Sequence, residues 1–185
     1  MSFIRLGASV VLACAALAVQ ADGLPTAELP GAQPVTMRNP LESLPSVDRV
    51  VVRKGERRLL LMHGGNIVRS YHVALGLSPV GQKERSGDFR TPEGSYRLAR
   101  RNPRSDYFLS IKVSYPNEQD VRRARARHWD SGGSIMIHGL PNQLRHDADY
   151  YQSHDWTDGC IAVSNGDMTE IWMLTPDGVP IDILP

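Results

Sequence analysis

The chain has 185 residues, of which 41% are hydrophobic and 22% are charged, and its formal net charge at pH 7 is +1. These values are typical of one soluble globular domain that is long enough to bury a hydrophobic core. Because a nearly neutral chain has no strong overall field, its composition gives no reason to expect a nucleic-acid partner.

The first 21 residues have the layout of a secretory signal peptide. A short basic start, MSFIR, precedes the apolar run LGASVVLACAALAV, and small residues follow at Val19 and Ala21. The run is short for a membrane span, so we expect a cleaved leader, a periplasmic or otherwise exported protein, and no stable membrane span after processing. An uncleaved anchor and lipidation at Cys14 are the alternatives, although Leu12 is bulky for a lipoprotein signal.

Residues 22–47 are expected to form a linker or arm, and residues 48–185 a single folded domain. The linker carries five prolines and has no sustained hydrophobic period. Beyond it, short runs rich in β-branched and apolar residues are separated by turn-forming residues, which predicts a mainly β domain that opens with an antiparallel meander. The predicted strands are 48–54, 58–63, 67–76, 94–100, 108–114, 133–139, 160–163 and 179–184.

Two short helices are predicted between the later strands. Asn117 can cap the first, over 117–129, with Asp120 three residues further on. Asn165 can cap the second, which continues to residue 175 and places Ile171, Trp172 and Leu174 toward a core. Few helices among many short strands favour a mainly β class.

Cys160 is the cysteine that remains if Cys14 leaves with the leader. Exported proteins usually pair their structural cysteines, so an unpaired thiol is a candidate nucleophile, with an apolar filler as the alternative. A nucleophilic cysteine needs a base within reach. His138 ends the apolar stretch GSIMIHG and is followed by Gly139. Such a histidine fits either a base facing a cleft or a structural residue bonded to a loop carbonyl.

The stretches GSIMIHG and TDGCIAV, together with GDFRTPEGSYRL (87–98) and SYPNEQD (114–120), resemble the L,D-transpeptidase catalytic domain, also called the YkuD-like domain. The resemblance covers roughly residues 48 to 185. It implies a single β-sandwich domain with two short helices. It also implies an enzyme of cell-wall cross-linking or remodelling that acts on peptidoglycan stem peptides, reacts with carbapenem-type inhibitors, and needs no metal or other cofactor.

The same resemblance assigns roles to individual residues. Cys160 is the acylated nucleophile and His138 its base. Backbone N–H groups near Asp158, Gly159 and Cys160 are expected to hold the oxyanion. Supporting roles fall to Gly139, beside the histidine, and to Thr157, a hydroxyl that could orient His138.

The sequence departs from the family pattern at three places. Asp158 stands where histidine is common, and Ala162 where arginine or asparagine often follows. The loop from Gly139 to Trp156 is longer than usual and contains His146 and His154, whose roles stay open. Asp158 either orients a hydrogen-bond donor or solvates the loop. These departures affect the substrate that is preferred rather than the nucleophile.

Three alternatives remain open from sequence. A zinc hydrolase would use a cluster of His138, His146, Asp149, His154 and Cys160, but the usual zinc-ligand spacings are missing. A wall-binding module with a disused active site is the second. The third keeps the cysteine chemistry and makes water the acceptor, which gives a carboxypeptidase or an amidase.

Overall fold

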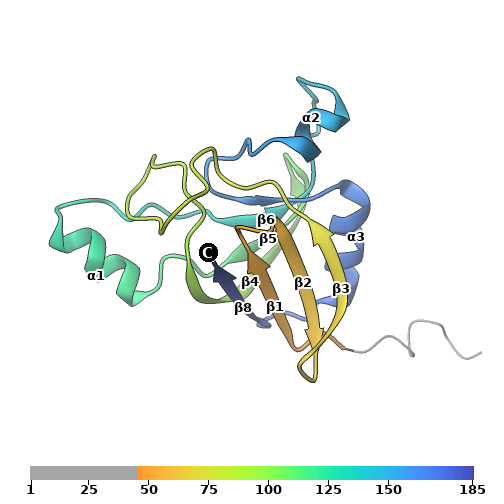
Figure 1. Cartoon of the computed structure of the whole chain (residues 1–185), viewed down its shortest axis with the longest axis horizontal. Helices are drawn as coiled ribbons and strands as arrows, with labels where there is room; N and C mark the ends of the chain where they lie inside the picture. The colour runs from red at the N-terminus through yellow and green to blue at the C-terminus, as the bar shows by residue number, and fades with distance from the viewer. Residues whose placement is uncertain (1–45) are drawn as a thin grey trace, which may run out of the picture. The chain divides into compact units, whose positions relative to one another are not determined.

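The computed structural model describes residues 46–185. The predicted leader over 1–21, Cys14 and nearly all of the predicted linker over 22–47 therefore lie outside the described residues. Eight strands were predicted, and the structure has a strand at each place (Figure 1). They are β1 (Arg49–Arg53), β2 (Arg58–His63), β3 (Asn66–His72), β4 (Gly94–Ser105), β5 (Phe108–Val113), β6 (Met136–His138), β7 (Ile161–Ala162) and β8 (Pro180–Leu184).

The described part of the chain also has three helices, one more than predicted: α1 (Glu118–Ala126), α2 (Ala148–Ser153) and α3 (Asn165–Leu174). The first is capped as predicted, because Asn117 and Asp120 form a reciprocal capping box. The last is capped by Ser164 rather than by Asn165, since the Ser164 side chain accepts the Asp167 N–H. The Asn165 side chain instead accepts the N–H of Leu140 and so ties α3 to the loop after β6.

All eight strands belong to one mixed sheet with the order β3-β2-β1-β8-β4-β5-β6-β7 (Figure 1). The predicted opening meander is confirmed, because β1 pairs with β2 and β2 with β3 in antiparallel register. Two pairs are parallel, namely β1 with β8 and β6 with β7. The mainly β class is therefore confirmed.

The sheet is divided by the long strand β4, which pairs with β8 in its first part and with β5 in its second. Register shifts along β4 mark bulges, which bend a strand and increase its twist. The two ends of the sheet meet where Ala74, just after β3, bridges Ala162 in β7. One core cluster contains side chains from both halves, among them Leu61, Val113 and Ile181. The two halves thus share a single core.

The core begins at Val47, one residue before the predicted start of the domain. Its side chain is buried, and only Asp48 separates it from the first residue of β1. In the half of the sheet that does not contain β1, the strands β5, β6 and β7 lie side by side, and α3 packs against β5. Within residues 46–185 no helix is both long and apolar enough to span a membrane.

Candidate active site

His138 ends the short strand β6 and is almost completely buried, with 4% of its surface exposed. Its Nδ1 lies 2.7 Å from the Gly139 carbonyl oxygen. A carbonyl only accepts, so Nδ1 carries the proton and Nε2 of the neutral ring is left to accept one. Burial lowers the pKa of His138 to about 4, and the Gly139 carbonyl opposes that shift in part. The imidazole is therefore neutral at pH 7 and able to act as a base.

Two aromatic rings keep water away from His138. The ring of Tyr107 lies 4.6 Å from the imidazole, centroid to centroid, and the ring of Trp156 meets it edge-on at 5.6 Å. These rings explain the burial that depresses the pKa. Sequence reasoning missed both, because they come from the β4–β5 turn and from the long loop before Cys160, and only the fold brings them to β6.

Cys160 lies between Gly159 and the first residue of β7, and it is half-buried. Its thiol donates to the Ser134 carbonyl oxygen at 3.5 Å. Burial raises the pKa of the Cys160 thiol; the nearby Asp158 charge adds to this, whereas a Met136 backbone hydrogen bond opposes it. The resting group is therefore a neutral thiol. Because the thiolate is the reactive form, this cysteine needs a base to take its proton.

Cys160 and His138 line the same pocket, which has a volume of about 370 Å³. Strand pairing explains why they meet, since β6 and β7 are adjacent and His138 is opposite Ala162, two residues after the cysteine. The sequence prediction placed both residues in one cleft, and the structure has them there. The other residues that line it are Ser105, Tyr107, Ser110, Gly133, Ser134, Ile135, Met136, Trp156, Thr157 and Asp158.

Ser110 is a lining residue that sequence reasoning missed. It lies on β5 directly opposite His138, is 1% exposed, and its hydroxyl has no hydrogen-bond partner among the described residues. The available signal was a serine at an inward position of the strand FLSIKV. An unpaired buried hydroxyl is costly. Such a group in a pocket is available to bind a ligand.

The hydroxyl of Thr157 stabilises the loop that carries the cysteine. It donates to the Cys160 carbonyl oxygen at 2.7 Å and accepts the Gly159 N–H at 3.1 Å. The expectation that Thr157 orients His138 therefore needs correction, because its hydroxyl is already used and the Gly139 carbonyl is the group beside the ring.

The same contact revises the expected oxyanion site. The N–H of Gly159 is engaged by Thr157 and is not available to a substrate. Within the described residues, the N–H groups of Asp158 and Cys160 have no hydrogen-bond acceptor. Two backbone donors next to the sulfur are the arrangement that stabilises a tetrahedral oxyanion. The candidate donors are therefore the two residues on either side of the glycine.

Both glycines of the site lie where an added Cβ would meet neighbouring atoms, which are side-chain atoms at Gly139 and a backbone carbonyl at Gly159. A Cβ on Gly139 would lie 2.5 Å from Asn165 Oδ1 and 3.0 Å from Phe108 Cβ. A Cβ on Gly159 would lie 2.6 Å from the Arg90 carbonyl oxygen, and its φ of +128° is one that other residues rarely adopt. Gly159 therefore lets the cysteine loop pack onto the chain before β4.

We expect Gly159→Ala to cost about 3 kcal/mol or more of unfolding free energy, because it combines a backbone clash with a disfavoured φ. Gly178→Ala is the matched control, since Gly178 has a φ of +79° and nothing within 4 Å of the added Cβ. That change should cost only about 1–2 kcal/mol of backbone strain. Urea unfolding of the two variants measures both costs, and equal costs would contradict the close-packing role of Gly159.

The histidines of the long loop lie elsewhere. The His146 ring packs at a tilt against Tyr150, with 4.1 Å between ring centroids, and the His154 ring stacks on the same tyrosine at 4.7 Å. Neither lines the pocket of Cys160. Among residues 46–185 no group of three or more His, Cys, Asp or Glu side chains is placed to hold a metal ion. The five side chains considered for a zinc hydrolase, His138, His146, Asp149, His154 and Cys160, therefore do not form a metal-binding cluster within residues 46–185.

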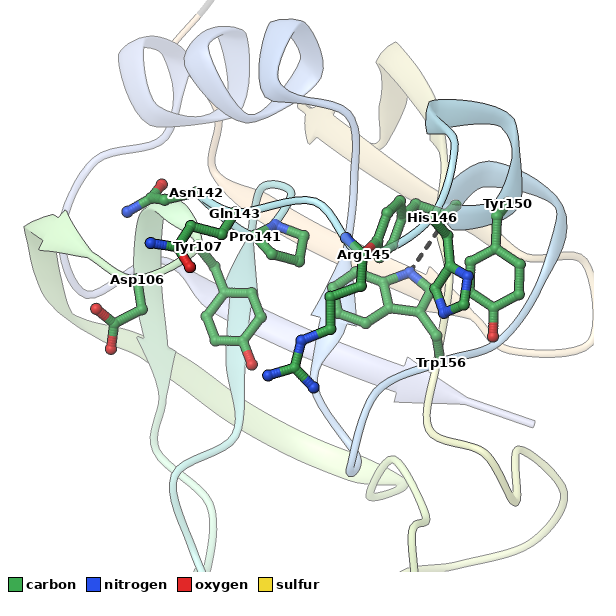
Figure 2. Close-up of a pocket in the computed structure, with 10 residues that line it drawn as sticks. Asp106, Tyr107, Pro141, Asn142, Gln143, Arg145, His146, Tyr150 and Trp156 are labelled. Atoms are coloured by element: carbon green, nitrogen blue, oxygen red, sulfur yellow. Dashed lines mark hydrogen bonds between the residues drawn. The ribbon is translucent and has the colours of Figure 1, made fainter.

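A second pocket, of about 710 Å³, adjoins the first (Figure 2). Tyr107 and Trp156 line both, so these rings form the wall between them. Figure 2 shows the Arg145 side chain extending into the second pocket, together with polar residues of the long loop. The long loop and helix α2 therefore enlarge the surface next to the candidate site.

Comparison with known proteins decides the family. The model of the L,D-transpeptidase catalytic domain matches residues 47–183, which is nearly the whole described domain and includes both His138 and Cys160. The chain belongs to the L,D-transpeptidase catalytic domain family. The match to the family model begins at Val47, which is also the first residue of the hydrophobic core.

Individual relatives match between 65% and 75% of the chain. YafK of Escherichia coli (strain K12), whose name assigns it to the L,D-transpeptidases without establishing the activity, is 37% identical over 123 residues, or 65% of this chain and 39% of YafK. The crystal structure of the helical cell shape determining protein Pgp2 from Campylobacter jejuni has a TM-score of 0.56 at 27% identity, and covers 75% of this chain and 48% of Pgp2.

Bd1075 of Bdellovibrio bacteriovorus shares the fold, with a TM-score of 0.51 at 24% identity over 75% of this chain and 48% of its own. This L,D-transpeptidase-family chain thus spans less than half the length of each of these relatives.

Proposed function

We propose that this family member is a cysteine-dependent L,D-transpeptidase that acts on peptidoglycan stem peptides through a thioester intermediate. One observation carries the proposal. A neutral, buried histidine and a protonated cysteine line the same pocket, beside two backbone N–H groups that have no acceptor within residues 46–185. This set supplies a nucleophile, a base and an oxyanion site, which are the parts that acyl transfer requires.

In the first half-reaction, Nε2 of His138 takes the thiol proton, and the sulfur of Cys160 attacks the peptide carbonyl carbon. By analogy with the family, that carbonyl belongs to the diamino acid at the third position of the stem. The N–H groups of Asp158 and Cys160 hold the oxyanion. Collapse breaks the C–N bond, and the departing D-alanine amine receives the proton held by His138, which leaves a thioester.

In the second half-reaction, an acceptor attacks the thioester and gives its proton to His138. The thiol is then released and regains that proton. An amine from a neighbouring stem gives a cross-link, whereas water gives a shortened stem. The thiol of the resting structure points to Ser134 rather than to His138. Catalytic hydrogen bonds in ligand-free enzymes commonly tighten only when substrate binds.

The cellular setting follows from the proposed substrate. Peptidoglycan lies outside the cytoplasmic membrane, and the apolar leader-like segment at 1–21 supports export to the periplasm or cell wall. The similarity to Pgp2, a helical cell shape determining protein, supports a role in wall remodelling and cell shape. The water-accepting reaction, a carboxypeptidase or amidase activity, is the second candidate, because the proposed acyl-enzyme would be the same for both.

Incubation of the purified protein with muropeptides tests the proposal. We expect mass spectrometry to detect loss of terminal D-alanine together with cross-linked dimers or exchanged residues. Shortened monomers alone would assign water as the acceptor. If the folded protein leaves every muropeptide unchanged and forms no acyl-enzyme, the proposal is wrong and a wall-binding role is favoured.

A further inference from the structure

Asp158 is the only acidic residue among the described residues that line the pocket of Cys160. These lining residues include no lysine or arginine, and their one histidine is held neutral. Asp158 is immediately before the Gly159–Cys160 pair, so its charge lies beside the nucleophile. The carboxylate raises the pKa of the thiol after burial has already raised it, which agrees with a short separation.

The side chain of Asp158 has no partner among the described residues. Within residues 46–185 its carboxylate forms no hydrogen bond and no salt bridge, and the residue is exposed. Asp155 in the same loop is the contrast, because Arg57 binds its carboxylate with contacts of 2.6 to 3.1 Å and the Leu75 N–H donates to it at 2.8 Å. Asp155 therefore has a structural role, whereas Asp158 lines the pocket without a partner among the described residues.

Lys83, the cation whose charge acts on the thiol, is already paired with a carboxylate. Lys83 opposes the rise in the thiol pKa, but its Nζ lies 2.6 Å from Asp88 Oδ1 and the pair is buried. A buried ion pair contributes little net field at a distance. Among the described residues that line this pocket, the charge without a counter-ion is thus negative.

A second, independent feature marks this pocket as a ligand site. The hydroxyl of Ser110 is buried, lines the pocket and has no hydrogen-bond partner among the described residues. Native structures rarely leave such a group unpaired without a ligand or water to satisfy it. The pocket therefore presents two unused polar groups, one of them anionic.

We propose that Asp158 selects substrates that bring an ammonium group to the mouth of this pocket. An ammonium that donates to a carboxylate forms a charge-assisted hydrogen bond, which is among the stronger polar contacts. The substrate class is then a stem peptide whose diamino residue keeps a free ammonium near the acylated carbonyl, rather than a neutral or acidic peptide. This inference rests on the proposed acyl transfer at Cys160 and adds a residue that determines specificity.

The first test uses the thiol itself and needs no peptidoglycan. Three methanethiosulfonate reagents, with cationic, neutral and anionic tails, react with the cysteine thiolate. In each case the sulfur–sulfonyl bond of the reagent breaks, its alkylthio group forms a disulfide with the cysteine, and methanesulfinate is released. The readout is the ratio of the rate constants for the cationic and anionic reagents at Cys160, measured in a Cys14→Ser background. We expect this ratio to exceed about ten at low salt and to shrink in 0.5 M salt, because screening weakens exposed charges.

In Asp158→Asn the ratio should fall by about tenfold. This substitution also lowers the pKa of the thiol and so speeds all three reagents, but a ratio cancels that common effect. Asp147→Asn changes the net charge equally at an exposed acid outside the pocket, and Ser110→Ala alters the pocket without changing its charge. Both controls should keep the ratio within about twofold of the parent.

The second test compares kcat/KM for a stem peptide with a free diamino-acid ammonium and for its N-acetylated form. We expect about a tenfold preference for the free amine, which Asp158→Asn removes and Asp158→Glu partly keeps. A ratio of rate constants that is the same in parent and Asp158→Asn overturns the inference, even if stem peptides are turned over. The methanethiosulfonate rate ratio could instead fall in Asp158→Asn while the parent protein turns over no stem peptide. That result would support the anionic site and overturn the proposed function.

Discussion

Cys160→Ser is expected to gain no adduct from a carbapenem, whereas the parent protein gains one drug mass. The strained carbonyl of the drug is attacked by the sulfur, its ring C–N bond breaks, and the nitrogen receives the proton taken up by His138. A serine hydroxyl in the same place is a far weaker nucleophile at neutral pH, so acylation should fall below detection. Intact-protein mass spectrometry measures the result, and thermal unfolding checks that the variant is folded.

The second cysteine of the chain provides the control for this experiment. Cys14→Ser should keep the full adduct, because Cys14 belongs to the leader-like segment of the sequence and the proposed nucleophile is Cys160. An adduct that persists in Cys160→Ser, or that maps by peptide mass to another residue, would contradict the assignment of the nucleophile. A buried structural cysteine would be inert to the drug in all three proteins.

His138→Gln should reduce the rate of acylation by about two to four orders of magnitude. Glutamine can still donate to the Gly139 carbonyl, but it cannot take a proton from the thiol, whose pKa is raised. His138→Ala should be at least as slow and also less stable, because it leaves a cavity among Tyr107 and Trp156. Stopped-flow acylation by a carbapenem measures the rates.

His154→Ala is the comparison variant, because His154 is exposed and lies on Tyr150 outside the pocket. It should change the rate by less than about threefold. If His154 proves essential while His138 can be replaced, the assignment of roles is wrong.

The pH dependence gives a second readout for the base. The active form of His138 is the neutral ring, and burial has lowered its pKa to about 4. Activity should therefore hold as the pH falls through 6.5, the usual value for histidine, and be lost only as it falls through about 4. In His138→Gln the residual rate should lack this acid limb. If the activity of the parent protein is already lost as the pH falls through 6.5, the imidazole of His138 is more hydrated than its packing indicates.

Many of the secondary-structure elements could be predicted from local sequence patterns. Short β-branched runs between glycine-containing turns predicted all eight strands, because strand propensity and turn chemistry depend on neighbouring residues. The capping box at Asn117 predicted α1 for the same reason. Helix α2 was missed, since its N-cap residue Asp147 makes no side-chain cap bond and the six-residue helix is stabilised by packing of Tyr151 and its neighbours.

The candidate nucleophile and base could also be found from sequence, because both occur in motifs that resemble the family. What the motif could not determine was the state of each group. The neutral form of His138 depends on Tyr107 and Trp156, which come from other parts of the chain. The engagement of the Gly159 N–H depends on how Thr157 turns its hydroxyl in the folded loop.

The sequence by itself determined the strands, two of the helices, the family resemblance and the pair Cys160 and His138. These features rest on residue type and on spacing along the chain. Only the tertiary structure decided which groups around the sulfur have no partner within residues 46–185, namely the Ser110 hydroxyl and the Asp158 carboxylate. The physical reason is that hydrogen bonding, burial and pKa depend on which distant segments pack together, and β5, β6 and the cysteine loop meet only when the sheet forms.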